Sequence, residues 1–265
     1  MSIKSRNSFA VTSIVLAAFV LQMAASAQEP KPAALQPKVE AATTASNDAS
    51  KGAPMEKDKR IQSHGLPWRF EKAIIANNPT RPRVLLVGDS ILNGYLPYVT
   101  SLLDGKAYVD VWVNPYYHSE NFNRMLAQNL TNGPYAIVHI NLGLHGFTKG
   151  RIPPGQFESL TRALIEVIRK ECPKAKIIWA TTTPILTKDK PARLDPELNP
   201  IIVGQNQIAK KLMAEMQVQV DDLYLVATNQ LDLSAGDQFH WQSPGYKVFA
   251  AAAVKEISAA LAAGK

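Results

Sequence analysis

The chain has 265 residues, of which 46% are hydrophobic, which is enough to form one sizeable core. Its single cysteine, Cys172, excludes an internal disulfide framework, and we expect it to be structural. The formal net charge of +7 is dispersed, with no basic stripe interleaved with aromatic residues, so we expect no nucleic-acid partner, whereas an acidic polysaccharide or another anionic surface stays open.

The first 27 residues are typical of a secretory signal peptide. Lys4 and Arg6 form a basic start, residues 9–23 are mostly apolar, and Ala25-Ser26-Ala27 places small residues where a signal peptidase cuts. We therefore expect cleavage after Ala27 and a bacterial protein that is periplasmic or secreted, with no stable membrane insertion afterwards. The alternative is an uncleaved helix that anchors the chain.

Residues 28–60 predict a disordered linker. They are rich in Ala, Pro, Lys, Thr and Ser and almost empty of large apolar side chains. Such a segment cannot bury enough surface to offset the entropy that ordering removes. The folded domain is therefore expected over residues 61–265.

Apolar runs and amphipathic segments alternate along this domain. Short apolar runs predict strands over residues 84–87, 107–113, 135–141, 176–181 and 218–221. Amphipathic spacing predicts helices over residues 69–77, 91–103, 120–130 and 157–171, within 199–216, and over 243–261. This alternation favours the α/β class, here a three-layer α/β/α domain with a doubly wound, mainly parallel sheet of five strands.

The turn after the first of these strands, Gly88-Asp89-Ser90, carries the first candidate for chemistry. A serine at a strand-to-helix turn places its Oγ at the carboxyl end of the sheet, where open α/β folds bind ligands. Its backbone N–H lies at a helix N-terminus, where it can stabilise a developing negative charge. The competing interpretation is an ordinary serine that caps a helix.

A second candidate is the loop that contains Asp237 and His240. An Asp and a His three residues apart on one loop can meet, with the imidazole Nδ1–H donating to the carboxylate. Nε2 is then free to accept a proton from a serine hydroxyl. Alone, this spacing better fits a solvated loop or a stray pair of metal ligands. Together with Ser90, in the chain order Ser, Asp, His, it favours a catalytic triad.

These motifs resemble the SGNH (GDSL-type) hydrolase superfamily over roughly residues 83–265, and the resemblance implies a flavodoxin-like sheet. Gly88-Asp89-Ser90 resembles the first block of the family, which implies that Ser90 is the nucleophile and, through its N–H, one oxyanion donor. Asp237 and His240 resemble the last block, which implies that His240 is the general base and Asp237 orients it. The run Thr181-Thr182-Thr183-Pro184 also resembles the family and is expected to shape the wall of the site.

The third block departs from the usual G-x-N-D pattern. The run Asn141-Leu142-Gly143-Leu144-His145 matches an N-x-G-L-H form instead, which implies that His145 stands where the oxyanion-hole asparagine would be. A neutral imidazole can donate one N–H, so the role could survive the change. The alternative is a structural histidine at a strand end.

The second block departs as well. The family normally supplies a glycine N–H after the second strand, and no glycine occurs between Asn114 and Asn132. Ser119, Asn121 or Asn123 could occupy this part of the oxyanion hole, and the sequence does not choose among them.

The remaining histidines have simpler interpretations. We expect His64 in the loop that enters the domain, His118 in a loop that could line the cleft, and His139 buried within the third strand. No H-x-H or H-E-x-x-H spacing occurs, and no glycine-rich phosphate-binding motif is present. We therefore expect neither a metal site nor a cofactor.

Three functions remain open at this level. The resemblance implies an exported serine esterase that hydrolyses small acyl esters, commonly acetyl esters of carbohydrates. An O-acyltransferase would use the same residues and would differ in excluding water from the acyl-enzyme. A non-catalytic binding domain that kept the fold is favoured by the two altered middle blocks, whereas Ser90, Asp237 and His240 argue against it.

Overall fold

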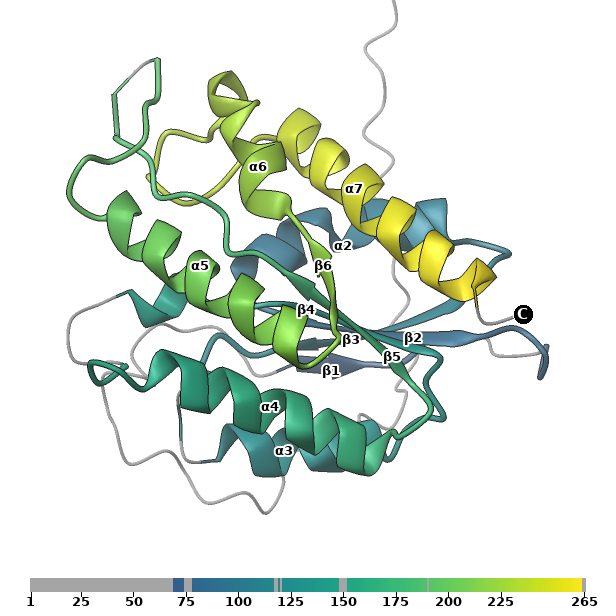
Figure 1. Ribbon diagram of the computed structural model, residues 1–265. Coiled ribbons are helices and arrows are strands. Elements are labelled where there is room, and N and C mark those ends of the chain that lie inside the picture. Colours follow the sequence, from purple (N-terminus) through teal and green to yellow (C-terminus); the bar gives the residue numbers. More distant parts are fainter. Residues whose placement is uncertain are drawn as a thin grey trace, which may run out of the picture. The chain divides into compact units, whose positions relative to one another are not determined.

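The structure is a computed structural model that describes residues 69–73, 78–116, 119, 121–147, 152–189 and 191–263. The expected signal peptide and linker lie outside these ranges, as do His64 and His118. The described residues form an α/β unit in which helices cover both faces of a central sheet (Figure 1).

The central sheet has six strands in the order β1-β3-β2-β4-β5-β6 (Figure 1). These are β1 (Arg69–Glu71), β2 (Arg83–Gly88), β3 (Tyr108–Val113), β4 (Ile137–Asn141), β5 (Lys176–Ala180) and β6 (Gln219–Asp221). Strands β2 to β6 pair in parallel, which confirms the predicted α/β class and its doubly wound parallel sheet of five strands. Because the chain passes from β2 to β3 on one side and then to β4 on the other, a topological switch point lies between β2 and β4.

The sixth strand, β1, corrects the helix predicted over residues 69–77. Its three residues pair antiparallel with β3, from Arg69 opposite Val113 to Glu71 opposite Val111. Phe70 packs against the apolar cluster on one face of the sheet. Backbone pairing with the free edge of β3 outweighs the weak helical preference of so short a segment. Residues 74–77 lie outside the described part of the chain.

Helices form the two outer layers. They are α2 (Ser90–Leu102), α3 (Phe122–Leu130), α4 (Phe157–Glu171), α5 (Asn199–Glu215), α6 (Leu223–Thr228) and α7 (Ser243–Ala262), with short 3-10 turns η1 (Leu144–Gly146) and η2 (Leu231–Leu233). Helices α2, α6 and α7 cover one face of the sheet, and α3 and α4 cover the other (Figure 1). None of the described helices is both long and apolar enough to cross a membrane.

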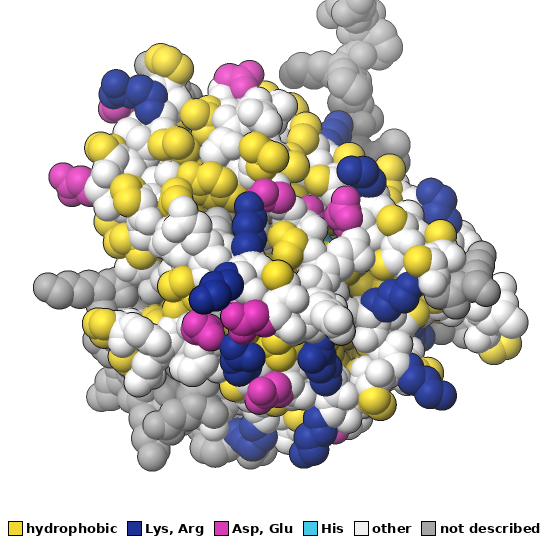
Figure 2. Space-filling model, viewed as in Figure 1, with side chains coloured by type: hydrophobic (Ala, Val, Ile, Leu, Met, Phe, Trp, Pro, Cys, Tyr) yellow, Lys and Arg dark blue, Asp and Glu magenta, His cyan; other side chains and the backbone are white. Residues whose placement is uncertain are grey.

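The core consists of two apolar clusters, one on each face of the sheet. In β2, Val84 and Leu86 point to the cluster under α2 and α7, and Leu85 and Val87 point to the cluster over α3 and α4. All four side chains are fully buried, as expected for a central parallel strand. On the face shown in Figure 2, basic, acidic and apolar side chains are interspersed.

His139 is fully buried at the centre of β4, as its place in the strand predicted. Its Nε2 lies 3.0 Å from Oδ2 of Asp221, at the end of β6. Strand β5 runs between these two strands, and there Ala180 is the residue opposite Asp221. A methyl side chain at this position is small enough for the imidazole and the carboxylate to meet across β5.

Candidate active site

Ser90 lies where β2 passes into α2, at the carboxyl edge of the sheet. Gly88 ends the strand, and a Cβ there would stand 2.9 Å from the carbonyl oxygen of Asn141 on the neighbouring strand, so this close approach requires glycine. Asp89 caps the helix, because its Oδ1 accepts a 2.9 Å hydrogen bond from the N–H of Ile91. The capping role that competed for Ser90 is thus filled by Asp89, and Ser90 is the first residue of the helix.

Ser90 and His240 meet although 150 residues separate them. The Oγ of Ser90 lies 3.0 Å from Nε2 of His240, and Nδ1 of His240 lies 2.6 Å from Oδ2 of Asp237. The other carboxylate oxygen of Asp237 accepts hydrogen bonds from the backbone N–H groups of Phe239 and His240. With Nδ1 protonated, the imidazole donates to Asp237, and Nε2 accepts the hydroxyl proton of Ser90.

Backbone contacts fix the loop that carries this histidine. Within residues 233–242, the N–H of Ala235 donates to the carbonyl of His240 at 2.8 Å. Gln238 has a φ of 80°, a left-handed conformation that costs a non-glycine residue about 1 kcal/mol or more. Its carbonyl accepts a 2.9 Å hydrogen bond from the N–H of Leu186, which holds the strained turn in place.

Asp89, next to Ser90 in the chain, and Asp237, which contacts His240, have pKa values shifted in opposite directions. Burial of Asp237 raises its pKa, but the hydrogen bonds donated by His240 and Phe239 outweigh burial and hold the pKa below its usual value. Burial raises the pKa of Asp89 to about 6, although the N–H of Ile91 and the nearby His240 act in the opposite direction. As the pH falls, Asp237 therefore stays ionised beside the imidazole to a lower pH than Asp89 does.

His145 lies in η1, directly after β4 and across the switch point from the Ser90 turn. Its half-buried ring meets Tyr116 edge to face, with ring centroids 6.1 Å apart. Gly143 begins this turn with a φ of 132°, and a Cβ there would stand 2.1 Å from Oγ1 of Thr182. The same hydroxyl donates a 2.9 Å hydrogen bond to the carbonyl of Leu142. Thr182, in the run 181–184, thus supports the turn that carries His145.

Asn206 on α5 supports the candidate site, and the sequence alone did not indicate this role. Its Oδ1 accepts a hydrogen bond from the N–H of Thr182, and its Nδ2 donates to the carbonyl of the same residue, both at 2.9 Å. This two-point contact fixes the segment that supports η1. One signal could have indicated it. Asn206 lies on the same buried stretch of the helix as Ile202 and Ala209, and a buried amide is expected to have hydrogen-bond partners.

The candidates for the second block lie near the start of α3. The Oγ of Ser119 and the Oδ1 of Asn123 are buried and have no hydrogen-bond partner among the described residues. Oδ1 of Asn121 accepts a 3.2 Å hydrogen bond from Arg124. The structure brings Ser90, Asp237 and His240 together, and the choice among Ser119, Asn121 and Asn123 stays open.

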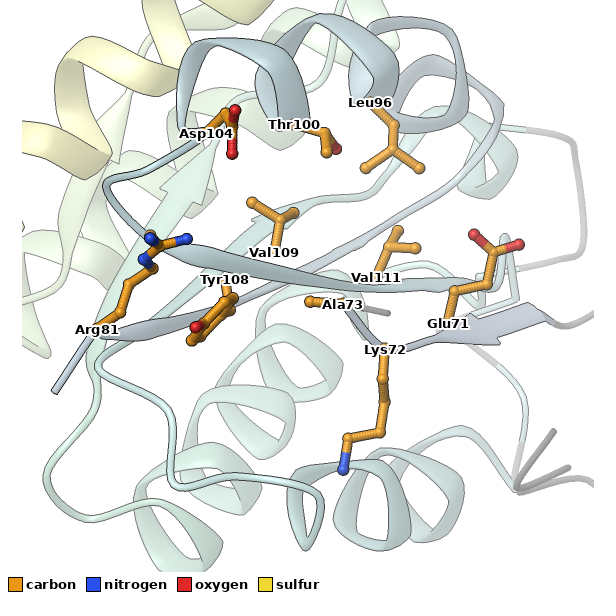
Figure 3. Close-up of a pocket in the computed structure, with 11 residues that line it drawn as sticks. Glu71, Lys72, Ala73, Arg81, Leu96, Thr100, Asp104, Tyr108, Val109 and Val111 are labelled. Atoms are coloured by element: carbon orange, nitrogen blue, oxygen red, sulfur yellow. The ribbon is translucent and has the colours of Figure 1, made fainter. Parts of the chain in front are cut away.

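A pocket of about 310 Å³ opens elsewhere, between α2 and the end of the sheet formed by β1 and β3 (Figure 3). Leu96 and Thr100 of α2 line it on one side and Tyr108 and Val111 of β3 on the other. No member of the Ser90–His240–Asp237 set lines this pocket. Within the described ranges, no group of three or more His, Cys, Asp or Glu side chains could hold a metal ion.

Solved structures of an acetylxylan esterase and of a lipase/acylhydrolase are similar to this chain. The acetylxylan esterase Axe2 from Geobacillus stearothermophilus matches with a TM-score of 0.53 and 16% sequence identity, over 66% of this chain and 94% of that one. A lipase/acylhydrolase from Enterococcus faecalis matches with a TM-score of 0.52 and 20% identity, over 66% of this chain and 95% of that one. This chain shares the α/β fold of these two enzymes.

The likeness to these two structures confirms the α/β fold that the sequence motifs implied. Neither the protein-family models nor the curated protein sequences give a match to the chain. In this fold, Ser90 and His240 meet at the carboxyl edge of the sheet, where open parallel sheets place their ligands.

Proposed function

We propose that this protein is a serine esterase that hydrolyses small acyl esters, with acetyl groups on carbohydrates as the substrate class. The observation that carries the proposal is the hydrogen-bonded series from Asp237 through His240 to the hydroxyl of Ser90. A serine hydroxyl is a weak nucleophile unless a base within hydrogen-bond reach removes its proton. His240 is such a base, and the carboxylate of Asp237 orients its ring.

In the first half of the reaction, Ser90 Oγ attacks the ester carbonyl carbon as its proton passes to Nε2 of His240. The carbonyl oxygen becomes an oxyanion, for which the N–H of Ser90 and the ring of His145 are the proposed donors. The tetrahedral intermediate then collapses, and the bond to the alcohol oxygen breaks. His240 returns the proton to that oxygen, so the alcohol leaves and the acyl group stays on Ser90.

In the second half, water replaces the alcohol. Nε2 of His240 accepts a proton from water as the water oxygen attacks the acyl carbon. Collapse of this intermediate breaks the bond to Oγ, which recovers its proton from His240, and the carboxylic acid leaves. An acceptor alcohol in place of water would give acyl transfer with the same residues, so the products decide between hydrolysis and transfer.

Two observations support the substrate class. One of the solved structures with this fold is an acetylxylan esterase, that is, an enzyme for an acetylated carbohydrate. The sequence of residues 1–27 favours export, which would bring the enzyme to polysaccharides outside the cytoplasm. We propose that the mature chain begins at Gln28, and mass spectrometry of the exported protein would reveal this N-terminus. A chain that keeps Met1 and stays with the membrane would contradict it.

Hydrolysis of an aryl acetate and of acetylated xylo-oligosaccharides, with the products identified, tests the function. We expect acetate from both substrates, and nearly complete loss of turnover in Ser90→Ala and in His240→Ala. The double variant should be little worse than either single one, because the residues act as a unit. Asp237→Ala should lose less turnover than either of these single variants. A non-catalytic binding domain would release no acetate, and a transferase would give acetylated acceptor instead.

A further inference from the structure

Two phenylalanines pack together beside the Ser90–His240 pair. The ring centroids of Phe147 and Phe239 are 5.7 Å apart, with their planes inclined by 36°. The ring of Phe239 also stands edge-on to the imidazole of His240, with centroids 6.5 Å apart. Both phenylalanines are half-buried, so part of each ring stays accessible. We call these two side chains the aromatic platform.

The aromatic platform is built into the two elements that carry the proposed chemistry. Phe239 lies between the triad residues, and its N–H donates a 3.1 Å hydrogen bond to Oδ1 of Asp237. Phe147 directly follows η1, two residues after His145. The platform therefore links the loop of the proposed base with the turn of the proposed oxyanion donor.

Its place beside His240 indicates which half of an ester it would meet. In the proposed reaction, Nε2 of His240 returns a proton to the alcohol oxygen, so that oxygen must lie within hydrogen-bond reach of the imidazole. The alcohol half of the substrate is then next to Phe239. An acetyl group ends in one methyl, which is too small to cover two phenyl rings, so the platform is better matched to the alcohol than to the acyl group.

The chemistry of the rings narrows the class of alcohol. The faces of aromatic rings are apolar and slightly negative, and they attract the slightly positive hydrogen atoms of C–H groups. One face of a pyranose ring presents several such C–H groups, and a small acyclic alcohol presents few. We propose that the aromatic platform of Phe147 and Phe239 binds one face of the pyranose ring whose hydroxyl carries the acetyl group, an inference that rests on the proposed function.

The test compares two acetate esters that differ only in the alcohol: an acetylated methyl xylopyranoside and ethyl acetate. Phe239→Leu and Phe147→Leu remove the ring but keep an apolar side chain of similar reach. Phe70→Leu is the matched control, because Phe70 is also half-buried but lies on β1 and packs on the opposite face of the sheet. For each variant, kcat/KM is measured with both esters and with ethyl butyrate, which has a longer acyl group. The rate of acetyl-enzyme hydrolysis is measured by rapid mixing.

We expect Phe147→Leu to lose roughly three- to tenfold in kcat/KM for the pyranoside, the effect of losing one aromatic contact, and less than about twofold for ethyl acetate. Hydrolysis of the acetyl-enzyme should be unchanged in Phe147→Leu, because the alcohol has already left. Phe239→Leu also removes a contact with the ring of His240, so it should slow both esters but lower kcat/KM more for the pyranoside than for ethyl acetate. Phe70→Leu should leave the ratio of the two esters unchanged. Equal losses with both esters would overturn the inference. So would a selective loss with ethyl butyrate against ethyl acetate, because the platform would then contact the acyl group. If the wild-type protein hydrolyses none of these esters, the proposed function itself is wrong.

Discussion

The ring of Tyr246 lies directly against Gly94. A Cβ at Gly94 would stand between 2.2 and 2.6 Å from three ring atoms of Tyr246, closer than any side chain allows. Gly94 is on α2, one turn after Ser90, and Tyr246 is in the first turn of α7, six residues after His240. This contact therefore sets the distance between the helix of the proposed nucleophile and the loop of the proposed base.

Gly94→Ala should lower both the melting temperature and esterase turnover, because the added methyl group must displace Tyr246. Alanine is otherwise the better helix former by roughly 0.5–1 kcal/mol, so a loss would identify the steric contact as its cause. Gly204→Ala on α5 is the control, since a Cβ there meets nothing within 4 Å and should stabilise the protein by about that amount. Adding Tyr246→Ala to Gly94→Ala should restore part of the loss in stability. Unchanged turnover in Gly94→Ala would show that the contact does not position the site.

Asp89 should make stability depend on pH in a predictable direction. Burial raises its pKa from 3.8 to about 6, so its contribution to the free energy of unfolding is full below pH 3.8 and is lost as the pH rises through about 6. The free energy of unfolding of Asp89→Asn, taken relative to that of wild type, should therefore be roughly 2 to 3 kcal/mol higher at pH 7 than at pH 4. Urea unfolding of both proteins at the two pH values measures this. A difference between them that does not change with pH would mean that the buried carboxyl group is not titrating in this range.

The parts of the fold and site that could be predicted are those with local signals. β2 is a run of apolar residues, and Asp237 and His240 are close in sequence, so their contact needed only one loop. Their approach to Ser90 then followed from the parallel sheet, because the loops at its carboxyl edge lie together.

The remaining parts depend on contacts that the local sequence does not encode. β1 forms because the edge of β3 is free, and its three residues carry almost no signal of their own. The six-residue helix α6 was missed for a related reason: it is short and depends on a cap from Asp222 and a contact from Thr181. The second oxyanion donor depends on loop geometry after β3, which no spacing rule determines.

The buried pair of His139 and Asp221 should be important for stability. His139→Leu leaves the buried side chain of Asp221 without this hydrogen-bond partner, and we expect a loss of about 1–3 kcal/mol in the free energy of unfolding, measured in urea. Replacing both residues with apolar side chains should lose less than the two single changes together. Arg193→Ala, which breaks the exposed pair with Asp189, is the control and should change stability by less than about 0.5 kcal/mol. A loss of that small size in His139→Leu would contradict the prediction.

Two variants of His145 distinguish a role as oxyanion donor from a purely structural role. His145→Ala should lower turnover by roughly a hundredfold, the usual effect of removing one donor, with little change in KM. His145→Asn should retain more activity, because an amide can also donate an N–H. Steady-state kinetics and melting temperatures of the two variants give the answer. Equal losses of turnover, together with lower melting temperatures, would favour the structural role.

The most direct test of the account is covalent labelling of the proposed nucleophile. A fluorophosphonate reacts with a serine only where a base activates its hydroxyl, and Nε2 of His240 is 3.0 Å from Oγ of Ser90. Peptide mass spectrometry of the treated protein should find one label, on Ser90. Ser90→Ala should carry none, and His240→Ala should react at least a hundredfold more slowly. An unlabelled wild-type protein, or a label on any other residue, would contradict the assignment of Ser90 as the nucleophile.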